Sequence, residues 1–263
     1  MAWAVLTALA YLVDIMVNMN LFISGGASGI GRSVVIAALS KGWNVGFSYH
    51  NNKEGAQQLL DIAVAEFPRQ LCRAYQLDVI DSGAVEYVGD RLLVDFSNID
   101  AVVCNAGIDL PGNLVSMTDE DWALVLNTNL TGTFYLIRYF LPLFLANKYG
   151  RIVTLSSLAK DGSSGQAAYA ASKAGLVGLT KTTAKEYGHF GITANVVVPG
   201  LINTEIIGDD IKGIKNFFAQ YAPVGRLGSP SEVAEAILFL VAKESSYVNG
   251  AVFNVTGGID WVY

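Results

Sequence analysis

Basic residues, cysteines and prolines are all scarce in this chain of 263 residues. It has 17 lysines and arginines against 23 aspartates and glutamates, a formal net charge of -6, and no basic cluster. Because nucleic-acid binding depends on a basic surface, we expect no nucleic-acid partner. Six prolines, 27 glycines and 52% hydrophobic residues are typical of one compact sheet-and-helix domain with tight turns.

The two cysteines, Cys72 and Cys104, both fall in stretches that we expect to be buried strands. A disulfide framework is not expected in a domain of this size with so few cysteines, so we predict reduced thiols and a cytoplasmic location. We assign no metal ligands in this sequence.

The first residues form an apolar extension, 1–18, in which residues 2–13 carry no charge. That run is shorter than the roughly 18 residues of a membrane-spanning helix. A basic segment typical of a signal peptide is also missing, although residues 8–10 resemble a cleavage site. We expect a packing or interface segment, or a start at Met16 or Met19. A peripheral membrane contact and a signal remain open, but we expect no membrane partner.

Short apolar runs alternate with longer helical patterns along the rest of the chain. Strands are expected near 20–24, 44–48, 72–77, 100–104, 151–156, 192–198 and 251–255. Helices are expected near 30–41, 53–66, 81–93, 119–144, 167–188 and 230–242. This alternation predicts an α/β fold: a single-domain Rossmann fold over 19–263, with a doubly wound, seven-stranded parallel sheet and helices on both faces. Functional residues should then follow the carboxyl ends of the strands.

A glycine-rich loop follows the first expected strand, from Ser24 to Gly31. Glycine allows the backbone to turn tightly and a phosphate to approach it closely. The helix that follows would present free N–H groups to a pyrophosphate. On its own this loop is a weak signal, and a plain strand–helix turn would explain it equally well.

The second strand ends in Tyr49, His50 and Asn51, and no acidic residue is present from 47 to 53. A carboxylate at this place usually binds the adenine ribose of NAD and would repel the 2′-phosphate of NADP. Its absence favours NADP(H), with NAD(H) left open.

Tyr169 and Lys173 are four residues apart in a helical pattern, which places both side chains on one face. A phenol with its ordinary pKa near 10 is a poor acid or base at neutral pH. A close ammonium lowers that pKa by about 1–3 units, so Lys173 would tune Tyr169 for general acid/base catalysis. The alternative for an isolated pair is an ordinary surface contact.

Taken together, the motifs resemble the classical short-chain dehydrogenase/reductase family from about residue 20 to 260. The glycine loop matches T-G-x-x-x-G-x-G with Ser24 in the threonine position, and Cys104-Asn105-Ala106-Gly107 matches N-N-A-G with Cys104 in place of the first Asn. Y-x-x-x-K and P-G-x-I-x-T, beginning at Pro199, are also present. The chain is most similar to the 3-oxoacyl-[acyl-carrier-protein] reductases, especially over Gly165–Pro199.

The resemblance implies a catalytic set in which each residue has a separate role. Ser157 would bind the substrate carbonyl, with Ser156 as the alternative, and Tyr169 would be the acid/base. Asn129, with Asn127 as the alternative, would hold a water that connects Lys173 to solvent.

It also implies a cofactor-binding set along the strand ends. These residues are Ser24, Gly25, Ser28, Gly29, Ile30, Gly31, Tyr49, His50, Asn51, Asp78, Val79, Asn105, Ala106, Gly107, Tyr169, Lys173, Pro199, Gly200, Ile202 and Thr204. Asp78 would lie against the adenine, and Ala106 and Gly107 would let the nicotinamide ribose approach the backbone. A mobile substrate lid is expected at about 203–222.

Two departures from the family pattern leave the substrate open. Thr256 stands where an Asp usually precedes the final Gly-Gly, and Tyr135 stands where a carrier-protein reductase would have an Arg, though Lys185 remains. We expect hydride transfer between NADP(H) and a small-molecule carbonyl or secondary alcohol. The expected substrates are 3-oxoacyl groups, carrier-bound or free, and related ketones. The alternative is a non-catalytic NADP-binding regulator or scaffold. We also expect a homodimer or homotetramer, assembled through helices 119–144 and 167–188.

Overall fold

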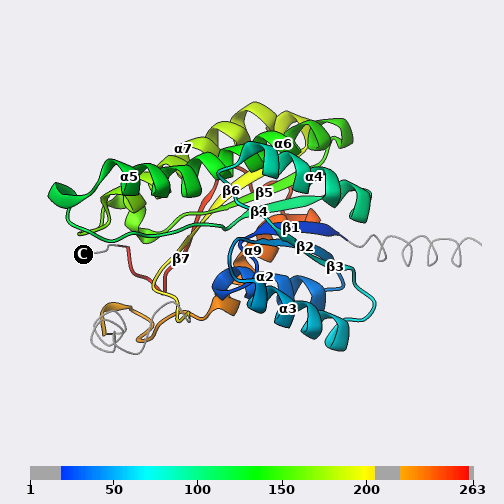
Figure 1. The fold of residues 1–263 in the computed structure, drawn as a ribbon, viewed down its shortest axis with the longest axis horizontal. Helices are drawn as coiled ribbons and strands as arrows, with labels where there is room; N and C mark the ends of the chain where they lie inside the picture. The colour runs from blue at the N-terminus through cyan, green and yellow to red at the C-terminus, as the bar shows by residue number, and fades with distance from the viewer. Residues whose placement is uncertain (1–18, 205–219, 261–263) are drawn as a thin grey trace, which may run out of the picture.

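Seven parallel strands form the centre of the molecule, in the order β3-β2-β1-β4-β5-β6-β7 (Figure 1). This computed structural model describes residues 19–204 and 220–260, so the extension 1–18 and most of the expected lid, 203–222, lie outside the described residues. The strands are β1 (Asn20–Ser24), β2 (Asn44–Tyr49), β3 (Cys72–Gln76), β4 (Ala101–Cys104), β5 (Gly150–Leu155), β6 (Ile192–Pro199) and β7 (Val252–Val255). The chain reverses its direction of travel across the sheet at β1, which pairs with both β2 and β4.

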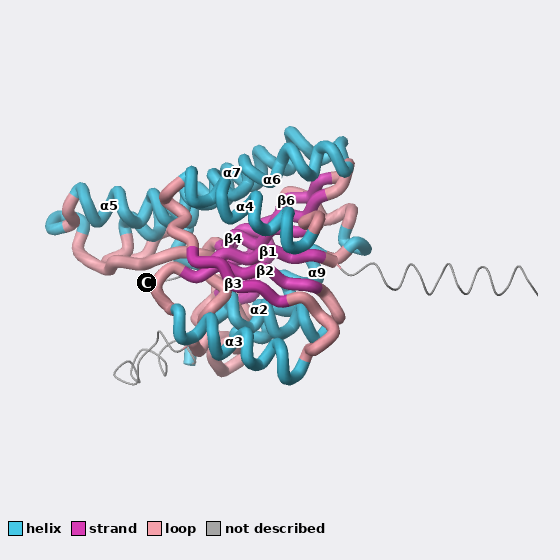
Figure 2. Tube along the Cα trace, turned by 45° about the vertical axis from the view of Figure 1, so that its right-hand side comes forward, coloured by secondary structure: helices cyan, strands magenta, loops and turns pink. Residues whose placement is uncertain are grey.

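Helices cover both faces of this sheet, as the two views in Figures 1 and 2 show. One layer contains α2 (Gly29–Ser40), α3 (Lys53–Glu66) and α9 (Pro230–Val241). The other contains α4 (Ser82–Phe96), α5 (Asp119–Leu126), α6 (Gly132–Asn147) and α7 (Ala167–Tyr187). The predicted doubly wound Rossmann fold is therefore confirmed. No helix within 19–204 or 220–260 has the length and apolar character needed to cross a membrane.

The strand sequences explain why helices are needed on both faces. Successive side chains of a strand point to opposite sides, and those of β1 are buried on both. Leu21 and Ile23 pack in the core beneath α2, α3 and α9, whereas Phe22 packs with Phe140 of α6 in the core on the other side. A sheet that is apolar on both faces must be covered on both, which is typical of parallel sheets.

The expected helix 119–144 is interrupted, and this prediction was wrong in its details. Between α5 and α6 the backbone makes a π-helical turn over Asn127–Thr131. A π turn inserts an extra residue into the helical path, and such turns are frequent at functional sites. Within this turn Asn129 lies in the interior, where only 1% of its surface is exposed, while Asn127 stays exposed.

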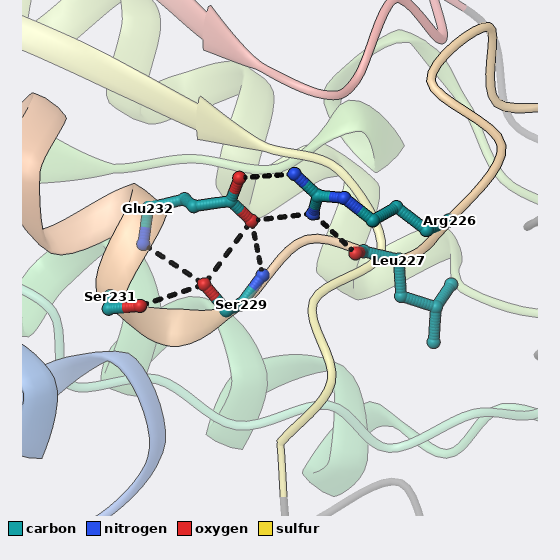
Figure 3. Close-up of polar contacts among 5 residues, drawn as sticks. All are labelled: Arg226, Leu227, Ser229, Ser231 and Glu232. Carbon is teal, nitrogen blue, oxygen red and sulfur yellow. Dashed lines mark hydrogen bonds and ion pairs between the residues drawn. The ribbon is translucent and has the colours of Figure 1, made fainter.

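The start of α9 is fixed by a capping box. The Ser229 hydroxyl accepts a hydrogen bond from the backbone N–H of Glu232 at 3.3 Å, and the Glu232 carboxylate accepts one from the Ser229 N–H at 2.8 Å. Arg226 donates two further hydrogen bonds to that carboxylate, at 2.8 and 2.7 Å (Figure 3). These bonds hold the carboxylate as an anion, and they lower the pKa of Glu232 to about 2, with Arg226 as the largest cause.

This cap also positions the segment that follows β6. Gly228, just before the cap, donates to the carbonyl of Leu201 at 3.1 Å and accepts from the N–H of Asn203 at 2.8 Å. The chain that leaves the carboxyl end of β6 is therefore attached to the beginning of α9.

We predict that Ser229→Ala lowers the free energy of unfolding by about 1 kcal/mol, because the first turn of α9 loses its side-chain cap. Ser231→Ala is the matched control. Its hydroxyl touches that of Ser229 at 2.8 Å but does not cap the helix, so we expect a change of less than about 0.5 kcal/mol. Urea denaturation of both variants measures the difference. Equal losses would contradict the assigned role of the cap.

Candidate active site

The glycine loop is joined to the end of β4 by side chains that the sequence assigned to the cofactor. The Ser24 hydroxyl accepts hydrogen bonds from the backbone N–H groups of Asn105 at 3.1 Å and Ala106 at 3.0 Å. The Asn105 amide donates to the carbonyls of Ser24 at 3.0 Å and Gly25 at 2.8 Å. Both polar side chains are thus engaged with the protein itself, and they shape the loop at the point where the strand order reverses.

The start of α2 has the features that a pyrophosphate requires. A Cβ atom on Gly31 would lie 2.1 Å from the Gly25 carbonyl oxygen, so only glycine fits there. Ser28 precedes the helix without capping it through its side chain, and the first turn, from Gly29 through Ile30, contains no acid. The N–H groups of that turn and the positive end of the helix dipole can then bind an anion. Thr204 lies opposite, 3.6 Å from the position of a Cβ on Gly29.

Tyr49, His50 and Asn51 leave the end of β2 beside the end of β3. His50 Nε2 is 3.7 Å from the carboxylate of Asp78, and that carboxylate also accepts a hydrogen bond from the Ile80 N–H at 3.2 Å. Val79 is buried and packs against Gly132 of α6, where an added Cβ would collide with the valine side chain. The edge assigned to adenine therefore contains an acid from β3 rather than one from β2.

The other assigned cofactor residues lie farther along the same edge. A Cβ on Gly107 would be 3.0 Å from Asn129 Oδ1 and 3.4 Å from Lys173 Nζ, so a glycine here leaves room above the lysine. Pro199 is the last residue of β6, and Gly200 is attached to β7 by a hydrogen bond from its N–H to Val255 O at 2.9 Å. Ile202 pairs with Gly228 as an isolated bridge. Thr256, the residue after β7, lies against Gly200 and leaves no room there for a Cβ.

The Asn129 amide connects three segments of this site. Its Oδ1 accepts a hydrogen bond from the Ile108 N–H at 2.8 Å, and its Nδ2 donates to the Ile108 carbonyl at 2.9 Å and to the Ser172 hydroxyl at 2.9 Å. Of the two candidates, Asn129 faces the site, and Asn127 instead accepts from Thr131 on the exposed side at 3.4 Å.

Ser157 and Ser156, at the end of β5, point to different places. The Ser157 hydroxyl hydrogen-bonds the phenol of Tyr169 and accepts from the Ala159 N–H at 3.2 Å. The Ser156 hydroxyl is buried and donates to the Lys173 carbonyl at 2.8 Å. Ser157 is therefore the serine that lies beside the tyrosine.

Tyr169 and Lys173 share one face of α7, with Lys173 Nζ 5.4 Å from the centre of the tyrosine ring. Lys173 is buried and donates to the Leu155 carbonyl at 2.8 Å. Burial lowers the pKa of Lys173 to about 8, against an opposing effect of Asp109.

The expected lowering of the tyrosine pKa is not found in the protein alone. Burial raises the pKa of Tyr169 above its ordinary value, against a lowering effect of the Ser157 hydrogen bond, and the charge of Asp109 also raises it. The sequence could not supply this result, because spacing reveals a neighbouring ammonium but not the loss of water around the phenol.

Asp109 and Gln166 are polar residues of this site that the sequence reasoning missed. Gln166, which precedes α7, donates a hydrogen bond from Nε2 to the Asp109 carboxylate. Burial raises the pKa of Asp109, while hydrogen bonds from Gln166 and the Leu110 backbone and the charge of Lys173 lower it. The available signal was its position, two residues after the N-A-G motif.

Comparison with known proteins agrees with this geometry. The family model described as Enoyl-(Acyl carrier protein) reductase matches residues 25–260. The chain is 35% identical to the 3-oxoacyl-[acyl-carrier-protein] reductase FabG of Escherichia coli (strain K12) over 241 residues, 90% of this chain and 95% of that protein. It is 37% identical to the FabG of Thermotoga maritima over 238 residues, covering 90% and 96%.

A solved structure shows the same similarity in three dimensions. The crystal structure of levodione reductase has a TM-score of 0.87 and 29% sequence identity, covering 91% of this chain and 96% of that one. Strand ends, glycine loop and Tyr–Lys pair thus occur in a chain that matches these relatives over nearly its whole length. The chain belongs to the short-chain dehydrogenase/reductase family and is an oxidoreductase acting on CH–OH or C=O groups.

Proposed function

We propose that this enzyme is an NADPH-preferring reductase of a 3-oxoacyl group or a related ketone, with Tyr169 as the proton donor. The observation that carries the proposal is the convergence of Ser157, Tyr169 and Lys173 at the carboxyl edge of the sheet. They meet beside Gly107, where a side chain would obstruct the space above Lys173. The relatives, which include 3-oxoacyl-[acyl-carrier-protein] reductases and levodione reductase, support a carbonyl substrate.

The protein's own residues supply the polar half of this reaction. The strand ends from Gly31 to Ile202 would hold the nicotinamide cofactor, which would supply the hydride for the carbonyl carbon. Ser157 would donate a hydrogen bond to the carbonyl oxygen and stabilise the negative charge that develops there. The Tyr169 hydroxyl would transfer its proton to that oxygen, which completes the alcohol.

Lys173 would stabilise the tyrosinate that remains. An ammonium close to the phenol favours its charged form, and Leu155 holds Nζ in place. Asn129 would act here through position, since its amide bonds both Ile108 and Ser172, the residue before the lysine. Asn129 would also hold a water that connects Lys173 to solvent.

Cofactor preference follows from the end of β2. Tyr49, His50 and Asn51 bring no carboxylate to this edge, and His50 can supply positive charge. The acid of the neighbouring strand, Asp78, is 3.7 Å from His50 and offsets part of that charge. We therefore propose a preference for NADPH that stops short of excluding NADH.

Tyr169→Phe should reduce turnover of a ketone such as ethyl acetoacetate by about 10²–10⁴-fold, since the general acid is lost. NADPH binding, measured by its fluorescence, should change little. Tyr187→Phe, at the other end of α7, is the matched control and should keep full activity. Residual activity of Tyr169→Phe above about a tenth of the original rate, a loss of less than roughly 1.4 kcal/mol in barrier, would refute the role.

Tyr49→Asp should reverse the cofactor preference, because a carboxylate at the end of β2 would repel the 2′-phosphate. Tyr49→Asn is the matched control, since it has the same size without the charge. We expect the NADPH/NADH ratio of kcat/KM to be at least about tenfold lower in the Asp variant than in the Asn variant, roughly 1.4 kcal/mol. Equal ratios in the two variants would show that the 2′-phosphate binds elsewhere.

We further propose a homodimer or homotetramer in the cytoplasm, assembled through α5–α6 and α7. The outer side of α4 and α6 carries a cavity of about 590 Å³ lined by Tyr135, Arg138 and Tyr139, among others. Phe134 is 39% exposed on α6 and its ring stacks under Arg138, 5.0 Å from the guanidinium carbon. Exposed aromatic residues together with arginine are enriched in protein interfaces. The two free cysteines, both buried, suit a reducing compartment.

Light scattering at micromolar concentration should give two or four times the chain mass of 28.1 kDa. Phe134→Glu should weaken the assembly, because it places a charge in the apolar part of the interface. Val64→Glu is the control, as Val64 is 75% exposed on α3, on the other side of the sheet. A monomer at these concentrations, or equal behaviour of the two variants, would contradict the proposed interface.

A further inference from the structure

The carboxylate of Asp109 is the one charged group that the proposed chemistry of the described site does not use. We propose that Asp109, held by Gln166, selects substrates by charge: the site accepts ketones that are neutral or cationic near the carbonyl and discriminates against those with a carboxylate or phosphate there. The inference rests on the proposed ketone reductase function and deepens it, because it names the substrate class.

The backbone on either side of Asp109 is fixed. Immediately before it, Ile108 is held through both its N–H and its carbonyl by the Asn129 amide, at 2.8 and 2.9 Å. Three residues after it, the Gly112 N–H donates to the Gly165 carbonyl at 2.8 Å, and Gly112 pairs with Gln166 as an isolated bridge. The loop after β4 is thus attached to the segment before α7.

The side chain of Asp109 is held as well. Gln166 Nε2 donates to its carboxylate, and Gln166 Oε1 in turn accepts from the Ser163 hydroxyl at 2.6 Å. Gln166 is three residues before Tyr169, so this chain of hydrogen bonds leads directly to the helix with the proposed acid. A carboxylate restrained in this way presents its charge at a defined place, which a mobile surface acid does not.

This charge acts on the reacting groups. Asp109 is two residues after Gly107, where a Cβ would lie 3.4 Å from Lys173 Nζ, and its charge acts on both Lys173 and Tyr169. The side chain remains exposed, with burial only partial, so an incoming ligand can meet it. An anionic substituent next to the carbonyl would be repelled, and a cationic one would be attracted.

The nearby lysines offset only part of this charge. Lys173 is buried and donates to Leu155, and Lys160 forms an ion pair with Asp161 in the short helix Leu158–Asp161. The hydrogen bond to a carbonyl leaves the charge of Lys173 in place, and that charge interacts with Asp109. Because Lys173 is buried and Asp109 is exposed, we expect the carboxylate to be the charge that an incoming substituent meets first.

Three small ketones that differ in charge test the proposal: acetoacetate, its neutral methyl ester, and trimethylammonio-acetone. For the original enzyme we expect kcat/KM for the ester to exceed that for acetoacetate at least about tenfold. Asp109→Asn keeps the size and the contact with Gln166 but removes the charge. This variant should raise the acetoacetate/ester ratio of kcat/KM about tenfold. It should lower the ratio of kcat/KM for the cationic ketone to that for the ester.

The comparison of ratios within one variant removes any general loss of activity from the result. Asp61→Asn is the matched control, because it removes the same charge from α3 on the other face of the sheet. It should leave all the ratios unchanged. Ratios that move by less than about twofold in Asp109→Asn, or by the same factor in Asp61→Asn, would overturn the proposal.

A second measurement needs no variant. Raising the ionic strength from about 0.01 M to about 1 M shortens the Debye length from roughly 30 Å to roughly 3 Å, and should narrow the discrimination in the original enzyme. If no ketone is turned over, the proposed function fails. Dissociation constants of the three compounds, measured calorimetrically with NADP⁺ present, then still decide charge selection, and equal constants would overturn it.

Discussion

The side-chain amide of Asn129 is the contact on which the rest of the site depends. It bonds the backbone of Ile108 after β4 and the hydroxyl of Ser172 on α7, at 2.8 to 2.9 Å. A buried amide with a donor and an acceptor can bond to both segments from this one position, which lies in the π turn Asn127–Thr131. Asn129 is four residues from buried Val125 and four from buried Thr133, so it shares the buried face of α5 and α6. The spacing along this helical path and the assembly of three segments are therefore one structural feature.

Burial at this junction determines the chemistry as much as the identity of the residues does. Lys173 is surrounded by protein, which lowers its pKa to about 8, and the same loss of water raises the pKa of Tyr169. The two effects oppose charge on either partner. A proton on Tyr169 is then favoured before the reaction, which suits a donor in the reductive direction. The ammonium becomes most valuable once the phenol has lost its proton, since opposite charges in a poorly solvated site attract strongly.

The fold and the placement of the proposed catalytic residues could be predicted from the sequence because they follow from local patterns. Alternating apolar strands such as β1 require cover on both faces, and the spacing of Tyr169 and Lys173 puts both on one side of a helix. Spacing could not show that Ser24 and Asn105 bond each other's backbone, which depends on two strands distant in sequence. Nor could it reveal the direction of the Tyr169 pKa, which depends on burial, or the pairing of Asp109 with Gln166 across 57 positions.

The way the loop after β4 is attached explains how the proposed charge selection can coexist with a fixed arrangement of the proposed catalytic residues. Asn129 holds this loop by the backbone of Ile108, so its bonds do not depend on which side chain follows at 109. The attachment at Gly112 likewise uses the main chain. A change at residue 109 can therefore alter the charge that meets the substrate while Ser157, Tyr169 and Lys173 keep their places. In a parallel sheet of this kind, substrate and cofactor bind at the same edge. Because the loop is held through its backbone, its side chains on the substrate side can vary without moving the proposed catalytic residues.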